Sequence, residues 1–139
     1  MAAVNPYLTF AGNCEEAFNF YKSVFGGEFL TISRFAEIPA EYKDSAGEDN
    51  LVMHVALPIG STILMGSDSP AHMGPVNAGN NFSIAISPDS EADADRIFKG
   101  LAAGGKITMP LDKAFWGAYF GMVTDKFGIA WMVNYDLKG

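Results

Sequence analysis

The spacing of hydrophobic positions changes several times along the first half of the chain, and each change marks the border of an expected element. Alternation over residues 5–10 predicts a short strand. A helix follows, with Asn13 as the expected cap, Glu16 completing a capping box and Gly26 ending it. Its apolar positions recur at helical spacing, at Ala17, Phe20, Tyr21 and Val24. Three strands are predicted after this helix, at residues 28–36, 51–57 and 62–65.

The second half shows the same order of patterns. A strand is predicted at 82–87, and Pro88, Asp89 and Ser90 open a second helix that ends at Gly104. Its apolar stripe consists of Ala94, Ile97, Phe98 and Leu101. Strands follow at 106–109, 119–124 and 129–135, and the last two form a hairpin around the turn 125–128.

The two halves repeat each other in order and spacing. Gly26-Gly27 and Gly104-Gly105 end the two helices and lie 78 residues apart. We therefore expect an α+β fold in which two βαβββ modules form one curved mixed sheet. The chain is predicted to be a single domain, residues 1–139, with module 1 at about 1–68, module 2 at about 80–139 and a joining loop at 69–79. The concave face of such a sheet is a natural pocket.

Composition narrows the possible partners and locations. The 139 residues carry a formal net charge of −7, which disfavours nucleic acids and anionic membrane surfaces as partners. No apolar run is long enough to span a bilayer, and the N-terminus lacks a secretory pattern. A single cysteine fits a reducing compartment, so we expect a cytoplasmic protein.

Four stretches carry a resemblance to a known superfamily. They are PYLTFAGNCEEAFNFYKSVFGGEF, VMHVALPIGSTILMGSD, AGGKITMPL and FWGAYFGMVTDKFGIAWMVN. Together they make the chain similar to the vicinal oxygen chelate superfamily, which includes glyoxalase I, bleomycin-resistance proteins and extradiol dioxygenases, and more narrowly to its PhnB-like branch. The resemblance implies two βαβββ modules around a U-shaped sheet, and a homodimer.

The resemblance also indicates where metal ligands stand in the members that use a metal. Those positions fall here at or beside Asn5, Met65, Asn81 or Phe82, and Met132. None of these is His, Asp or Glu, the usual ligands of the divalent metals concerned. We therefore expect no metal and no other cofactor. Some members of the branch carry a demethylubiquinone methyltransferase label, but the chain has no Gly-rich loop typical of an adenosyl-cofactor site.

Eight residues are predicted to line the pocket, because alternation places them on strand faces expected to meet the cavity or because their side chains suit an organic ligand. They are Asn5, Tyr7, His54, Met65, Trp116, Phe120, Met132 and Asn134. His54 is alternatively a base or hydrogen-bond donor, or a structural histidine of the core or of a dimer interface. The aromatic and Met side chains of the closing hairpin are alternatively core residues.

Three other features have a simpler interpretation. Cys14 in the first turn of the helix is either a reactive thiolate or a small packed residue, and packing is favoured. His72 is expected to be solvated. Asp44, Glu48 and Asp49 form a solvated acidic loop rather than a calcium site, because their spacing matches no calcium-binding loop.

The resulting hypothesis is a metal-independent protein that binds a small organic molecule in the concave pocket, with no reaction assigned. One alternative is a lyase or dioxygenase with relocated metal ligands, such as His54 with a loop carboxylate. Another is a resistance protein that sequesters a flat aromatic cation.

Overall fold

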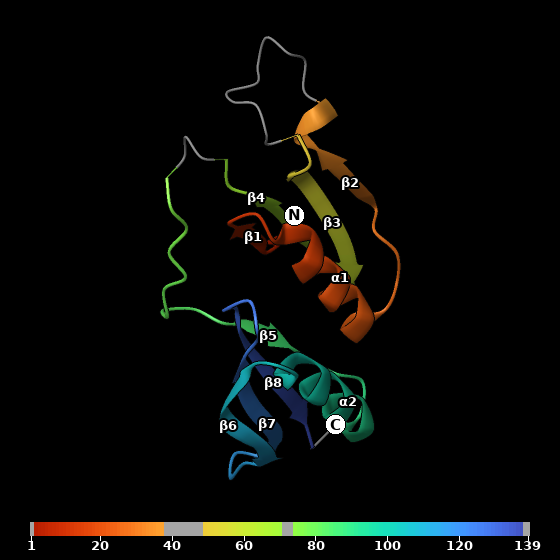
Figure 1. Cartoon of the computed structure of the whole chain (residues 1–139). Helices are drawn as coiled ribbons and strands as arrows, with labels where there is room; N and C mark the ends of the chain where they lie inside the picture. Colours follow the sequence, from red (N-terminus) through yellow and green to blue (C-terminus); the bar gives the residue numbers. More distant parts are fainter. Residues whose placement is uncertain (1, 38–48, 71–73, 138–139) are drawn as a thin grey trace. The chain divides into compact units, whose positions relative to one another are not determined.

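The computed structural model describes residues 2–37, 49–70 and 74–137. It divides into two compact units, Met1–Asn77 and Ala78–Gly139, which are described separately below. Within the described residues each unit contains one α-helix and one four-stranded mixed sheet (Figure 1). The predicted α+β class with two βαβββ modules is therefore confirmed. That the chain forms a single domain stays a prediction.

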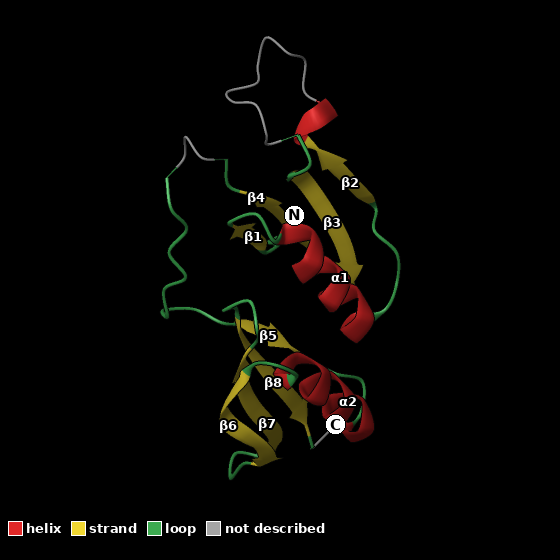
Figure 2. Cartoon of the chain, viewed as in Figure 1, coloured by secondary structure: helices red, strands yellow, loops and turns green. Residues whose placement is uncertain are grey.

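The sheet of the first unit has the order β1-β4-β3-β2. Its strands are β1 (Tyr7–Phe10), β2 (Thr31–Arg34), β3 (Val52–Ile59) and β4 (Thr62–Asp68). The β1–β4 pair is parallel and the other two pairs are antiparallel. Helix α1 (Cys14–Phe25) covers one face of the sheet, and the short 3₁₀-helix η1 (Phe35–Glu37) follows β2 (Figure 2).

The sheet of the second unit has the order β5-β8-β7-β6. Its strands are β5 (Ile84–Ile86), β6 (Lys106–Lys113), β7 (Ala118–Thr124) and β8 (Ala130–Asp136). Here β5 and β8 run parallel, and the other pairs are antiparallel. Helix α2 (Glu91–Ala102) lies across one face of this sheet (Figure 2). No helix within the described part of the chain is long and apolar enough to cross a membrane.

Each core lies between a helix and the sheet face below it. The α2 stripe of Ala94, Ile97, Phe98 and Leu101 is buried as predicted. In α1 the prediction was partly wrong, because Phe18 is fully buried while Phe20 is only half-buried. The ring of Phe18 packs directly on Gly66 of β4, where an added Cβ would come within 2.6 Å of it.

The two helices begin in different ways. The side chain of Ser90 caps the N-terminus of α2, because its Oγ accepts a hydrogen bond from the N–H of Asp93 at 3.0 Å. The capping box predicted at Asn13 is wrong, since its side chain makes no cap hydrogen bond. The carboxylate of Asp68 replaces it and accepts the N–H groups of Gly12 and Cys14, both at 2.9 Å.

Several strand borders differ from the predicted ones. Strand β2 is shorter than the predicted 28–36 because the chain turns into η1 at Phe35. Strand β4 extends to Asp68, and β6 continues through Pro110 to Lys113 instead of ending at 109. Pro110 is tolerated because β6 is an edge strand with irregular register on both sides of Met109.

The hairpin turn predicted at 125–128 is confirmed. Gly128 has φ +89°, which only glycine adopts readily. Asp125 is almost fully buried and accepts the N–H groups of Phe127 and Ile129 at 2.8 and 3.1 Å. Its second oxygen accepts the indole N–H of Trp131 at 2.8 Å, so one carboxylate fixes both the turn and the largest core side chain.

Candidate functional site

In the first unit, three of the predicted site residues lie on the sheet face opposite α1. Leu8 and Phe10 of β1 are buried toward the helix, so Tyr7, which comes just before Leu8, points to the other face. Tyr7 is the register partner of Met65 on β4, and its ring lies 5.9 Å from the ring of His54 on β3. We call this face, with Tyr7, His54 and Met65, the helix-free face of the first sheet.

Asn5 stands just before β1 and its side chain has a structural contact. Its Oδ1 accepts a hydrogen bond from the backbone N–H of Ile63 at 2.9 Å. This bond attaches the entry of β1 to β4. The amide oxygen is therefore already bound by a backbone donor.

In the second unit, the other four residues also gather on one face. Phe120 is the register partner of Asn134, and Met122 is the partner of Met132. The alternate residues of β7 and β8 are buried toward α2, where an added Cβ on Gly121 would come within 2.7 Å of Phe98. The face with Phe120, Met122, Met132 and Asn134 is thus the helix-free face of the second sheet.

Trp116 joins this face from the turn before β7. Its ring centroid lies 5.5 Å from that of Phe120, with the rings at 68°. Phe115 packs edge-on against Trp116 at 5.1 Å and is 96% exposed. Trp116 itself is 51% exposed, so the aromatic group is open to a ligand.

Met109 also belongs to this face, although the sequence pattern did not identify it as a site residue. Met109 on β6 is the register partner of Met122, which in turn pairs with Met132. Three thioether side chains therefore lie side by side across three neighbouring strands. Met109 was expected only as the end of a strand. Because the register of β6 is irregular, simple alternation does not give the side of the sheet on which Met109 lies.

The remaining candidates have plain outcomes. Cys14 has no exposed surface, and its pKa is raised to about 12 by burial first and by the charges of Asp68 and Glu15 next. The favoured interpretation, a packed cysteine, is confirmed. His72, Asp44 and Glu48 lie outside the described residues. Within the described ranges, no group of three or more His, Cys, Asp or Glu side chains is placed to hold a metal ion.

The side chains at the positions implied for a metal do not suit one. Met65 and Met132 offer thioethers, which are soft ligands. The oxygen of Asn5 is occupied by the Ile63 N–H. At the remaining position Phe82 is a hydrocarbon and 65% exposed, and the neighbouring Asn81 offers only a neutral amide. A hard or borderline divalent ion such as Mg²⁺ or Zn²⁺ does not fit this set of donors.

The fold and the two helix-free faces agree with a known protein superfamily. Residues 3–133 match the model of the Glyoxalase/Bleomycin resistance protein/Dioxygenase superfamily. The chain belongs to this superfamily, which is the resemblance expected from its sequence motifs.

Relatives of this chain include Protein YjdN of Escherichia coli. It is 36% identical over an alignment of 140 positions that covers 94% of this chain and 93% of the relative. An uncharacterized protein of Mycobacterium bovis, Mb0911c, is 25% identical over 98% of this chain and 84% of its own length.

Solved structures support the same assignment. Protein PA1353 from Pseudomonas aeruginosa is 41% identical, with a TM-score of 0.88 over 98% of both chains. A Bacillus cereus structure titled a putative 3-demethylubiquinone-9 3-methyltransferase, PhnB protein, is 30% identical, with a TM-score of 0.74 over 96% of this chain and 99% of that one. PhnB-like proteins are therefore among the structural neighbours.

Proposed function

We propose that this chain binds a small organic molecule on the helix-free faces of its sheets, without a metal ion. The observation that carries the proposal is the kind of side chain on these faces. Tyr7 and His54 lie together on one, and Trp116 and Phe120 lie together on the other. Together with the hydrocarbon ring of Phe120, the polar groups on Tyr7, His54 and Trp116 combine a large apolar contact area with a few oriented hydrogen bonds, as ligand sites do.

The row of Met109, Met122 and Met132 supports the same proposal. Methionine side chains are unbranched and polarizable, so they adapt to ligands of different shape. The row lies on the same face as Phe120 and Asn134. A flat apolar body would rest on the thioethers and the Phe120 ring, and the Asn134 amide would supply a hydrogen bond.

Absence of a metal is part of the proposal and rests on the donors present. The thioethers and the occupied Asn5 amide favour an organic ligand over a divalent ion. The alternative of a lyase or dioxygenase with relocated ligands centres on His54. It requires metal uptake that is lost in His54→Ala. The other alternative, a sequestering resistance protein, requires binding of a flat aromatic cation without turnover.

The test is a ligand screen by thermal shift, followed by calorimetry on each hit. We expect Trp116→Ala to weaken binding of a hit at least about fivefold, because stacking on an aromatic pair contributes on the order of 1 kcal/mol or more. Leu30→Ala is the control, since Leu30 is an apolar side chain that is 64% exposed just before β2 and belongs to neither proposed face. If every hit binds Trp116→Ala as tightly as it binds the unchanged chain, the proposed face is refuted.

A homodimer in the cytoplasm is proposed alongside this function. Native mass spectrometry of the purified full chain tests the assembly state, and a monomer mass at micromolar concentration would reject the dimer. The same spectrum reports any tightly bound metal. Fractionation of cells that produce the protein at its natural level tests the location.

A further inference from the structure

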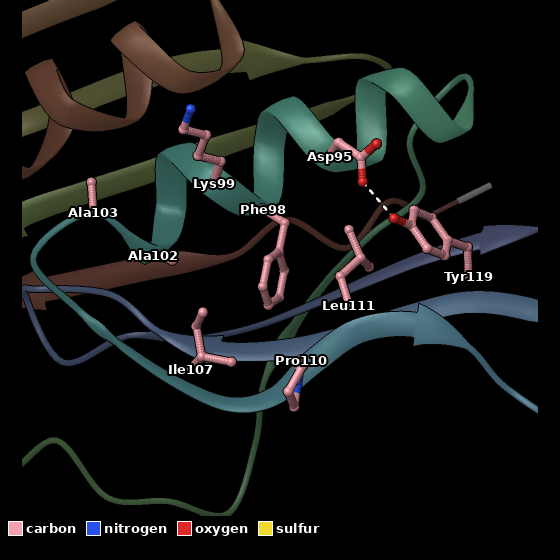
Figure 3. Close-up of a pocket in the computed structure, with 9 residues that line it drawn as sticks. All are labelled: Asp95, Phe98, Lys99, Ala102, Ala103, Ile107, Pro110, Leu111 and Tyr119. Carbon is pink, nitrogen blue, oxygen red and sulfur yellow. Dashed lines mark hydrogen bonds between the residues drawn. The ribbon is translucent and has the colours of Figure 1, made fainter.

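The second unit has an open groove on the helix side of its sheet. Its volume is about 550 Å³ and it runs between α2 and β6 (Figure 3). The floor is mostly apolar and consists of Phe98, Ala102, Ile107, Pro110 and Leu111. The groove is therefore separate from the helix-free face of the same sheet, which holds Phe120 and Met132. Its size lies within the range of small-molecule sites.

Small side chains at the end of α2 leave this floor uncovered. The helix ends in Ala102 and is followed by Ala103, whereas α1, also of 12 residues, ends in Phe25. Ile107 on the floor remains 49% exposed as a result. About half of an isoleucine side chain is available for contact with an apolar ligand.

The strand beside the groove is poorly suited to pairing with another strand. Pro110 offers no N–H, and the register of β6 shifts on both sides of Met109. Lys106 and Lys113 stand at the two ends of β6. Charges, proline and irregular register at a sheet edge all disfavour the addition of a strand. The groove is thus better matched to a small molecule than to an extended peptide.

One end of the groove is negatively charged. The Tyr119 hydroxyl donates a hydrogen bond to Oδ1 of Asp95 at 2.5 Å. This bond is the main reason that the Tyr119 pKa is raised to about 12, and the charges of Glu91 and Asp112 add to it. Of these carboxylates, Asp95 lines the groove and Glu91 lies one turn earlier on α2. Asp112 is the register partner of Phe120 and so belongs to the helix-free face, from which its charge acts on Tyr119 without lining the groove.

The positive charges of two lysines oppose the charges of these carboxylates. Lys113 is the register partner of Tyr119 and contributes one positive charge there. Lys99 also borders the groove, but Figure 3 shows its side chain directed away from Ile107 and Pro110. The balance at the Tyr119 end stays negative, in line with the net charge of −7 of the whole chain.

We propose that this groove is a second binding site, for a small amphipathic cation. The apolar body would cover Phe98 and Ile107, and the cationic head would lie beside the Asp95 carboxylate and the Tyr119 ring. A quaternary ammonium head matches both partners, because it is attracted to a carboxylate and to the face of an aromatic ring. This site does not depend on the proposed function of the helix-free faces.

The test uses benzyltrimethylammonium as the probe and backbone-amide NMR shifts of the full chain as the readout. We expect saturable shifts centred on Ala102, Ile107 and Tyr119. Phenylacetate, which has the same ring and the opposite charge, should bind at least about tenfold more weakly. Asp95→Asn should weaken binding of the cation at least about fivefold, while Glu16→Gln, an equal charge change in the first unit, should leave it unchanged.

A second variant tests the cavity and not the charge. Ala102→Phe should fill the groove and abolish the shifts, and Ala92→Phe on an exposed part of the same helix should not. The proposal is overturned by any of three results. These are no saturable binding at millimolar probe, equal affinity for phenylacetate, or shifts centred on Phe120 and Met132 instead of the groove.

Discussion

At the scale of single residues, buried carboxylates organise each unit of this protein. Asp68 accepts three backbone N–H groups, from Gly12, Cys14 and Val52, each at 2.9 Å. It joins the turn before α1 to the start of β3, and it is only 2% exposed. The predicted strand ended at residue 65, before this aspartate, so its role was not predicted.

Replacing Asp68 should therefore be costly. Asp68→Ala leaves three buried N–H donors without an acceptor, and we expect a loss of about 3 kcal/mol or more in the free energy of unfolding. Asp68→Asn should cost less, because its amide oxygen still accepts a hydrogen bond. Its N–H₂ group cannot accept one, so part of the loss remains. Urea denaturation measures both, with the exposed Asp112→Ala as control. A loss equal to that of the control would contradict the assigned role.

Cys14 provides a second prediction at this scale. Its pKa is raised from 9.0 to about 12, so at pH 8 its thiolate fraction should be about 1000-fold below that of an ordinary cysteine. The helix N-terminus alone would act in the opposite direction, and burial outweighs it. We expect a coloured disulfide reagent to label the native protein very slowly and the guanidinium-unfolded protein at once. Equal labelling rates would show that the thiol is accessible.

At the scale of elements, the two helices differ in how they begin, and this difference can be measured. Ser90→Ala removes the side-chain acceptor for the Asp93 N–H and should lower stability by about 1 kcal/mol. Asn13→Ala should change stability by only a few tenths, because Asp68 and not Asn13 binds the first free N–H groups of α1. Thermal or urea unfolding of both variants tests the contrast, and equal losses would refute it.

Prediction from sequence worked for elements whose signals are local. The α2 stripe, the Ser90 start and the turn at Gly128 all follow from spacing and turn chemistry, and the structure confirms them. It failed where the decisive partner is distant. Asp68 lies 54 residues from Cys14, and no local pattern reveals that contact. Strand β6 passes through Pro110 because it has a free edge, which is a property of the sheet and not of the strand.

The candidate faces show the same limit. Alternation along each strand is enough to group Phe120 with Met122 on β7 and Met132 with Asn134 on β8, and the strand register agrees. Alternation alone could not show that these two pairs share a face with Met109, because that depends on the register across three strands. The groove between α2 and β6 is still less visible, since it arises from what the side chains of two elements leave unfilled.

At the scale of the whole molecule, membership of the superfamily makes metal binding the question to decide. We expect no stabilisation of the full chain by Zn²⁺, Ni²⁺ or Mn²⁺ and no loss of stability on treatment with a chelator. A metal that binds only the folded state stabilises it by about 2.7 kcal/mol at a free concentration 100 times its dissociation constant. Such an increase is easily detected as a rise in the melting temperature. Metal analysis of the dialysed protein gives the stoichiometry independently.

His54→Ala makes this measurement decisive in both directions. If a metal stabilises the protein and this variant abolishes the effect, the ligands have moved to His54 and the metalloenzyme alternative replaces the proposed function. His54 is the one imidazole among the described residues, and its ring lies 5.9 Å from that of Tyr7. If a metal stabilises neither the unchanged chain nor His54→Ala, the proposed function stands, because the thioethers and aromatic rings of the helix-free faces suit an organic ligand better than a metal ion.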